Sequence, residues 1–122
     1  MYTGSCLCGS VAVSVEADFS TVEFCHCSVC RKAHSSAFAI GVTISSDEFN
    51  VTAGRELLSE YQSSEGKFRV FCSRCGSHMY AYRPAAPQNV RLRPAILDTD
   101  LNQFSVKHIF EESSGVLNQS KT

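Results

Sequence analysis

The sequence lacks several features that would assign a protein to a broad class. It has no tryptophan, and no apolar run approaches the roughly 18 residues that a transmembrane helix needs. It also lacks a surplus of charge, with 11 Lys and Arg against 12 Asp and Glu and a net charge of −1. We therefore expect no membrane association. We also expect no nucleic-acid partner, because phosphate binding calls for a basic surface.

The first residues lack a signal for export as well. Met1 to Ser5 contain neither the positive charge nor the apolar stretch of a secretory signal peptide, so we expect a cytoplasmic protein. The composition, 43% hydrophobic and 19% charged, is that of an ordinary globular protein. We expect residues 1–122 to form one domain, with a core over about residues 3–112 and a loose tail from Gly115.

Short stretches with a two-residue apolar period recur along the chain. The period is clearest at Val11, Val13 and Val15, and it is typical of strands. No strong helical period exceeds two turns. We predict strands at 10–16, 38–44, 49–52, 67–71, 79–82, 90–93 and within 104–110, a short helical turn at 28–33, and either a strand or a short helix at 57–62. The expected fold class is therefore mainly β, with small packed sheets.

Cysteine is the residue type that is present in excess. The seven cysteines are an odd number and fall into three groups, which are Cys6 and Cys8, then Cys25, Cys27 and Cys30, then Cys72 and Cys75. A secreted disulfide framework favours an even number and an export signal. Grouped cysteines in a reducing compartment are more often metal ligands, and Cys-x-x-Cys steps have the spacing of zinc ligands.

Two allocations of these cysteines compete. In the first, the knuckles Cys27/Cys30 and Cys72/Cys75 share one zinc ion, which leaves the other three thiols over. In the second, each group stays intact: Cys6, Cys8, Cys72 and Cys75 form a closed structural site, and Cys25, Cys27 and Cys30 hold a second ion with an open position. Three protein ligands and one open position are typical of catalytic zinc. The spacing alone leaves both allocations open.

Five segments of the sequence resemble the glutathione-dependent formaldehyde-activating enzyme family, which is also named for centromere protein V. They are Gly4-Ser5-Cys6-Leu7-Cys8-Gly9, Cys25-His26-Cys27-Ser28-Val29-Cys30-Arg31-Lys32, Phe71-Cys72-Ser73-Arg74-Cys75-Gly76-Ser77, and Leu97-Asp98 with Lys107-His108-Ile109-Phe110. The resemblance implies an Mss4-like fold of small antiparallel β-sheets built around zinc knuckles. It also implies a structural zinc on Cys6, Cys8, Cys72 and Cys75 and a second zinc on Cys25, Cys27 and Cys30. The chain departs from the family in lacking a tryptophan shortly after the His-Ile-Phe stretch.

The activity that this resemblance implies is the condensation of glutathione with formaldehyde, which is the reaction of a carbon–sulfur lyase run in reverse. The expected cofactor is zinc, glutathione is the expected co-substrate, and the expected partners are a small thiol and an aldehyde. An open zinc site deprotonates an entering thiol, and the fixed charges of Arg31 and Lys32 could balance the added anion. His26 is the predicted catalytic residue, as the proton donor to the developing alkoxide. The alternative function is a non-catalytic zinc-binding scaffold for a protein or nucleic-acid partner.

Other readings of the nearby polar residues stay open. His26 could instead hydrogen-bond a zinc thiolate or a carbonyl. His34, four residues after Cys30, could complete the second site as a fourth ligand. We expect His78 and His108 to serve packing or to lie at the surface. We expect Arg91 and Arg93, which alternate on one strand, to lie on a solvated sheet face.

Overall fold

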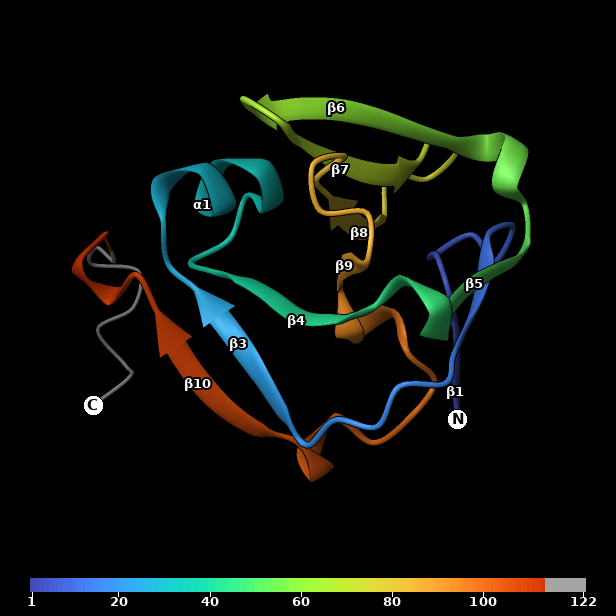
Figure 1. Cartoon of the computed structure of the whole chain (residues 1–122), viewed down its shortest axis with the longest axis horizontal. Helices are drawn as coiled ribbons and strands as arrows, with labels where there is room; N and C mark the ends of the chain where they lie inside the picture. Colours follow the sequence, from blue (N-terminus) through green and yellow to red (C-terminus); the bar gives the residue numbers. More distant parts are fainter. Residues whose placement is uncertain (114–122) are drawn as a thin grey trace.

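The computed structural model describes residues 1–113, so the predicted loose tail from Gly115 lies outside the described residues. The described chain forms two sheets and one short α-helix (Figure 1). The smaller sheet contains three antiparallel strands in the order β1 (Tyr2–Ser5), β2 (Ala12–Val15) and β5 (Phe49–Ala53). Within residues 1–113, no helix is long and apolar enough to cross a membrane.

The larger sheet contains seven strands. Their order is β10 (Ser105–Ile109), β3 (Thr21–Cys25), β4 (Ala39–Ser45), β9 (Asn89–Leu92), β8 (His78–Tyr82), β7 (Lys67–Cys72) and β6 (Leu58–Ser64). The helix α1 (Ser28–His34) follows β3 directly. Short 3-10 helices occupy Ser46–Glu48, Arg55–Leu57, Pro94–Ile96, Leu101–Gln103 and Glu111–Ser113.

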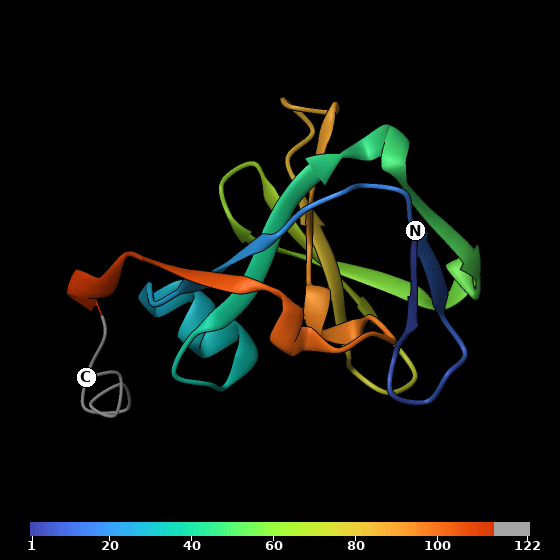
Figure 2. The same cartoon turned by 90° about the horizontal axis from the view of Figure 1, so that it is seen from below.

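The mainly β prediction is confirmed. The predicted strands correspond to β2, β4, β5, β7, β8, β9 and β10, the helical turn at 28–33 is α1, and the ambiguous stretch at 57–62 is mostly strand β6. Two strands were not predicted, β1 and β3. One pairing also differs from the antiparallel expectation, because β10 runs parallel to β3, and Figure 2 shows the two strands side by side. A parallel neighbour 84 residues away leaves no local pattern in the sequence.

Two adjoining apolar clusters hold the sheets together. One contains buried residues of both sheets, including Val15, Val42, Ile44, Leu92 and Phe104. The other contains Cys6, Val11, Val13, Cys72 and Met79. Residues Val13 and Val15 point inward because successive side chains of a strand face opposite sides. The second cluster includes Cys6 and Cys72, so two of these cysteines are also part of the apolar core.

The N-terminal and C-terminal parts of the family-like pattern meet in the fold. Gly4 pairs with Leu97 in an isolated bridge, and the amide of Asp98 donates to the carbonyl of Thr3 at 2.8 Å. A Cβ at Gly4 would clash with the carbonyl oxygen of Ile96, so this close approach requires glycine. The two segments are more than 90 residues apart in the sequence and lie against each other in the structure.

The register of the larger sheet brings cationic side chains onto one face. Arg69 on β7 lies opposite Ala81 on β8, which lies opposite Arg91 on β9. The small residues leave space for the long side chains, and a Cβ at Gly41 would come within 2.5 Å of Arg91 Nε. This face continues toward the cysteines at the end of β3.

Candidate metal centres

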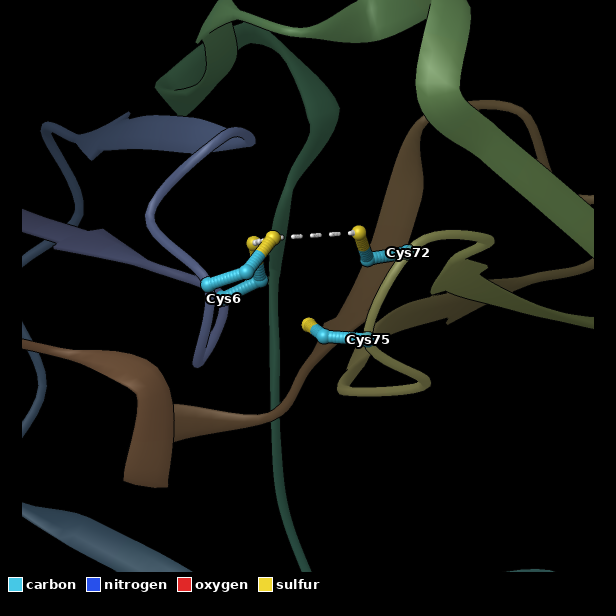
Figure 3. A group of neighbouring side chains, drawn as sticks. Cys6, Cys72 and Cys75 are labelled. Atoms are coloured by element: carbon cyan, nitrogen blue, oxygen red, sulfur yellow. Dashed lines mark hydrogen bonds between the residues drawn. The ribbon is translucent and has the colours of Figure 1, made fainter.

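The first thiol group joins two loops that are distant in the sequence. Cys6 and Cys8 lie in the loop between β1 and β2, whereas Cys72 ends β7 and Cys75 lies in the loop before β8. Their four Sγ atoms lie within 4.8 Å of one another. In Figure 3, Cys6 faces Cys72 and Cys75 across the gap between the loops. These four thiols therefore lie together in the structure, and Cys27 and Cys30 are not among them.

The sulfur positions of this first group suit a tetrahedral zinc site. The Sγ atoms of Cys6 and Cys8 are 3.5 Å apart, and those of Cys8 and Cys72 are 4.0 Å apart. Four thiolates at about 2.3 Å from one zinc ion lie roughly 3.8 Å from one another. The four donor atoms and their spacing thus fit zinc, and no fifth ligand is needed.

Backbone and hydroxyl groups form hydrogen bonds with the sulfur atoms of Cys6 and Cys75. The amide of Val11 donates to Cys6 Sγ at 3.3 Å, and Ser77 Oγ lies 3.3 Å from Cys75 Sγ. The side-chain and backbone hydrogen bonds from Ser77 lower the pKa of Cys75 to about 5. Gly76 adopts a φ of +83°, which only glycine adopts easily, and its amide donates to the carbonyl of Cys72 at 2.7 Å. The turn is therefore shaped to present both sulfurs.

The second thiol group is local in the sequence. Cys25 ends β3, Cys27 is the N-cap of α1, and Cys30 lies in the first turn of the helix, and their Sγ atoms lie within 4.8 Å of one another. The amide of Cys30 donates to Cys27 Sγ at 3.3 Å. Cys25 and Cys30 are buried, whereas Cys27 is half-buried. Among residues 1–113 no fourth His, Cys, Asp or Glu joins this cluster, which has the donor set of an open zinc site.

Arg69 is the residue that connects the second cluster to the sheet. It is 3% exposed, and its Nη2 donates to Cys30 Sγ at 3.6 Å. Its Nε donates to Ser63 Oγ at 2.9 Å and its Nη1 to His34 Nε2 at 3.3 Å. Burial raises the pKa of Cys30, but the hydrogen bond from Arg69 and those with Cys25 and Cys27 outweigh it and bring the pKa down to about 7. The sequence analysis missed Arg69, because it lies 39 residues from Cys30.

The structure does not place His34 in the thiol cluster. Its Nε2 accepts from Arg69, and its ring lies 4.4 Å from that of His78. Burial, with the charges of Arg93, His78 and Arg69, lowers the pKa of His34 to about 3. His34 is therefore neutral at physiological pH and holds Arg69 in place. His78, expected to be a packing or surface residue, is its ring partner.

His26 lies entirely inside the protein. Its ring is 0% exposed and lies 5.0 Å from the ring of His108 and 5.4 Å from that of Phe38. The Nε2 of His26 forms a 2.8 Å hydrogen bond with Nδ1 of His108, and Arg31 Nε donates to the His26 carbonyl at 3.3 Å. His108 is thus a direct partner of the predicted proton donor, a role that the sequence analysis did not assign. The pairing comes from the parallel contact of β10 with β3.

The expectation of a solvated face for Arg91 and Arg93 is wrong. Arg91 forms an ion pair with Glu23, and Arg93 is only 5% exposed. Burial, with the charges of Arg69 and Arg91, lowers the pKa of Arg93 to about 10, so it stays charged at neutral pH. Arg91 lies on β9 and Arg93 directly follows that strand, and the sequence alone did not reveal that Arg93 lies in a pocket wall together with His34 of α1.

Two open pockets lie beside α1. The larger, of about 710 Å³, includes Lys32, Tyr61, Arg69, Phe71 and His78 in its wall. The other, of about 500 Å³, includes His34, Phe38, Ala39, His78 and Arg93. Ala33, Gly76 and His78 belong to both walls, so the pockets adjoin. Lys32 therefore faces a pocket, whereas Arg31 is engaged with His26.

Comparison with known proteins matches residues 1–113 to the family described as glutathione-dependent formaldehyde-activating enzyme. A Halomonas elongata protein provisionally named as such an enzyme is 36% identical over 80% of this chain and 66% of its own length. An uncharacterized lyase of Schizosaccharomyces pombe is 30% identical over 65% of this chain and 56% of its own length. A crystal structure of a Rhodobacter sphaeroides protein superposes with a TM-score of 0.69 at 28% identity, covering 86% of this chain and 99% of that one. The match thus spans less than two thirds of the length of each of these two curated relatives.

Substitutions in the two clusters should have different effects on stability. We expect Cys72→Ser to unfold most of the domain, because Cys72 is fully buried in the core and structural zinc contributes folding energy outright. Cys27→Ser should cost no more than about 2 kcal/mol, because Cys27 is half-buried and serine is itself a good N-cap. Urea unfolding of the zinc-loaded proteins, followed by circular dichroism, measures both. Equal losses would contradict the division into a structural and an open cluster.

Proposed function

The chain belongs to the glutathione-dependent formaldehyde-activating enzyme family, and we propose that it is a zinc-dependent carbon–sulfur lyase acting on the adduct of a glutathione-type thiol and a small aldehyde. In the direction of synthesis, the reaction joins glutathione and formaldehyde to give S-hydroxymethylglutathione. The proposed location is the cytoplasm, where reducing conditions keep clustered thiols free to bind metal.

The observation that carries this proposal is the pair of unequal thiol clusters. Cys6, Cys8, Cys72 and Cys75 supply four sulfurs, whereas Cys25, Cys27 and Cys30 supply three beside two pockets. A closed cluster has no position for a substrate, and a cluster of three has one. The second cluster is therefore where a thiol would enter. Zinc, when held by these three residues, supplies a position at which an incoming sulfur is stabilised as a thiolate.

Arg69 sets the charge around this entry position. Its guanidinium donates to Cys30 Sγ and is fixed on its other edges by Ser63 and His34. Because three thiolates around one divalent ion would leave a net charge of −1, the approach of a fourth anion is favoured by positive charge nearby. Arg69 provides that charge in a fixed orientation, so its proposed role is to let a second anionic sulfur approach the cluster.

The reaction itself moves one proton and forms one bond. The thiol loses its S–H proton, the sulfur lone pair forms the S–C bond, and the C=O π electrons move to oxygen, which then takes a proton. No electrons are gained or lost overall. The residues of the chain have to position the two reactants and supply the proton to oxygen.

We propose His26 as the source of that proton, connected to solvent through His108. His26 has no exposed surface, so a proton can reach it only through a neighbour. His108 forms the 2.8 Å hydrogen bond to His26 Nε2, and its side chain is 26% exposed. An imidazole can take up a proton at one ring nitrogen and release one from the other.

Thiol binding at the second cluster can be observed directly with cobalt in place of zinc. Adding glutathione at millimolar concentration should increase the thiolate-to-cobalt absorption band, because a fourth sulfur joins the three of the chain. S-methylglutathione, which has no free thiol, is the matched control and should leave that band unchanged. If glutathione leaves the absorption band unchanged as well, the result would contradict the proposed function.

The proton route can be tested with two separate variants. We expect His26→Gln and His108→Gln each to lower the turnover of S-hydroxymethylglutathione by about 100-fold or more, in the range that general acid catalysis contributes. Glutathione affinity, measured by the cobalt band, should stay the same in both. Normal turnover in His26→Gln would rule out this proton route. A parallel loss of thiol binding would instead assign the histidine pair to the shape of the site.

A further inference from the structure

The covered face of the larger sheet carries more positive charge than its acidic residues balance. Lys67 and Arg69 come from β7, Arg91 from β9, and Arg93 follows β9 directly. Within residues 1–113, the acid that forms an ion pair with this group is Glu23, and its partner is Arg91. Burial and the charge of Arg69 lower the pKa of Lys67, which reflects the crowding of cations. An additional anion would relieve this crowding.

The guanidinium groups of Arg69 and Arg91 have hydrogen-bond acceptors within the protein. Arg69 donates to Cys30, Ser63 and His34, and Arg91 donates to Glu23 and to Thr43 Oγ1. Three thiolates around one divalent ion leave a single net negative charge, which Arg69 offsets. Two cations of this face are left without an ion pair among residues 1–113: Lys67, which is half-buried, and Arg93, which is the more deeply buried of the two.

The hydrogen bonds of Arg93 leave one edge of its guanidinium unused. Nη1 donates to the carbonyl of Ile40 at 3.3 Å, whereas Nε and Nη2 are buried and have no acceptor among the described residues. Nε–H and Nη2–H point to the same side of the planar group, and their spacing matches the two oxygens of a carboxylate. Leaving two buried donors unpaired costs stability. The unused edge is therefore the one that binds carboxylates in pairs of hydrogen bonds.

Arg93 also lies in a place that a ligand can approach. It contributes to the wall of the pocket of about 500 Å³, together with His34, His78 and Ala39. Ala39 packs against Cys25 and Cys30, so the same wall borders the open thiol cluster. Both free nitrogens are covered in the unliganded chain, so a ligand would enter with a side-chain shift at the pocket wall.

We propose that this pocket binds a carboxylate group of the thiol substrate through the Nε and Nη2 edge of Arg93, which makes Arg93 the residue that favours acidic over neutral thiols. The inference rests on the proposed function for the thiol, but the carboxylate site itself is argued from Arg93 and its pocket. Arg93 acts as a specificity residue: it holds one end of the molecule while the sulfur reaches the second cluster.

Two thiols of equal length test this proposal on the cobalt-loaded protein. They are 3-mercaptopropionate, which ends in a carboxylate, and 3-mercaptopropionamide, which ends in a neutral amide of the same shape. We expect the acid to bind about 10- to 100-fold more tightly, which is the worth of a charge-assisted bidentate contact. The cobalt absorption band gives both dissociation constants, and titration calorimetry gives them independently of any activity.

Two variants, at Arg93 and at the nearby Arg91, separate the effect of Arg93 from general electrostatics. In Arg93→Gln the acid should bind about as weakly as the amide, and the dissociation constant of the amide should be unchanged. Arg91→Gln is the matched control, because it removes a cation two residues away whose partner is Glu23, and it should keep most of the preference. If Arg93→Gln does not fold, the difference in affinity of the wild-type protein for the acid and the amide still tests whether the pocket binds a carboxylate.

The outcomes distinguish this inference from the proposed function. Equal binding of acid and amide by the wild type would overturn the carboxylate site and leave the thiol site intact. A preference that persists in Arg93→Gln, or that falls equally in Arg91→Gln, would also overturn it. Failure of both thiols to change the cobalt band would instead contradict the proposed function.

Discussion

The meeting of Cys6 and Cys8 with Cys72 and Cys75 is the contact on which most of this structure depends. It joins loops 64 residues apart and brings the small sheet against the large one. The chain also has a direct link at this place, because Ser77 Oγ accepts from the amide of Leu7 at 2.9 Å and lies beside Cys75. Cys6 and Cys72 belong to the apolar core, so the geometry of the thiols and the packing of the sheets are coupled.

That contact also places the groups around the second cluster. Cys72 ends β7, and Arg69 lies three residues earlier on the same strand, with its guanidinium on Cys30. The helix α1 has only seven residues and one buried side chain, Cys30, so it is too short to be stable alone. Arg69, His34 and the thiols themselves hold it on the sheet. Strand β7 thus connects the proposed structural site, through Cys72, to the proposed catalytic site, through Arg69. The two sites differ in their surroundings, with hydroxyl and amide groups around the first and buried guanidinium groups around the second.

The cysteine spacing and the strand periods were enough to predict the mainly β class and the three thiol groups. They could not choose between the two allocations, since that choice depends on which loops meet in space. The contacts that the sequence did not predict also depend on segments that are distant in the sequence and meet in space. Arg69 reaches Cys30 across 39 residues, and His108 reaches His26 across 82 through a parallel strand pair. Arg93 looked like one member of an alternating exposed pair, because burial by a distant helix leaves no trace in the local pattern.

We propose that the chain holds one closed and one open zinc site, and elemental analysis of the protein, purified under reducing conditions in the presence of zinc, measures how many ions it binds. Two zinc ions per chain are expected, with X-ray absorption giving an average of between three and four sulfur ligands per ion. One zinc ion per chain, with four sulfur ligands, would contradict the two-site arrangement, because Cys25, Cys27 and Cys30 would then be free thiols without a metal.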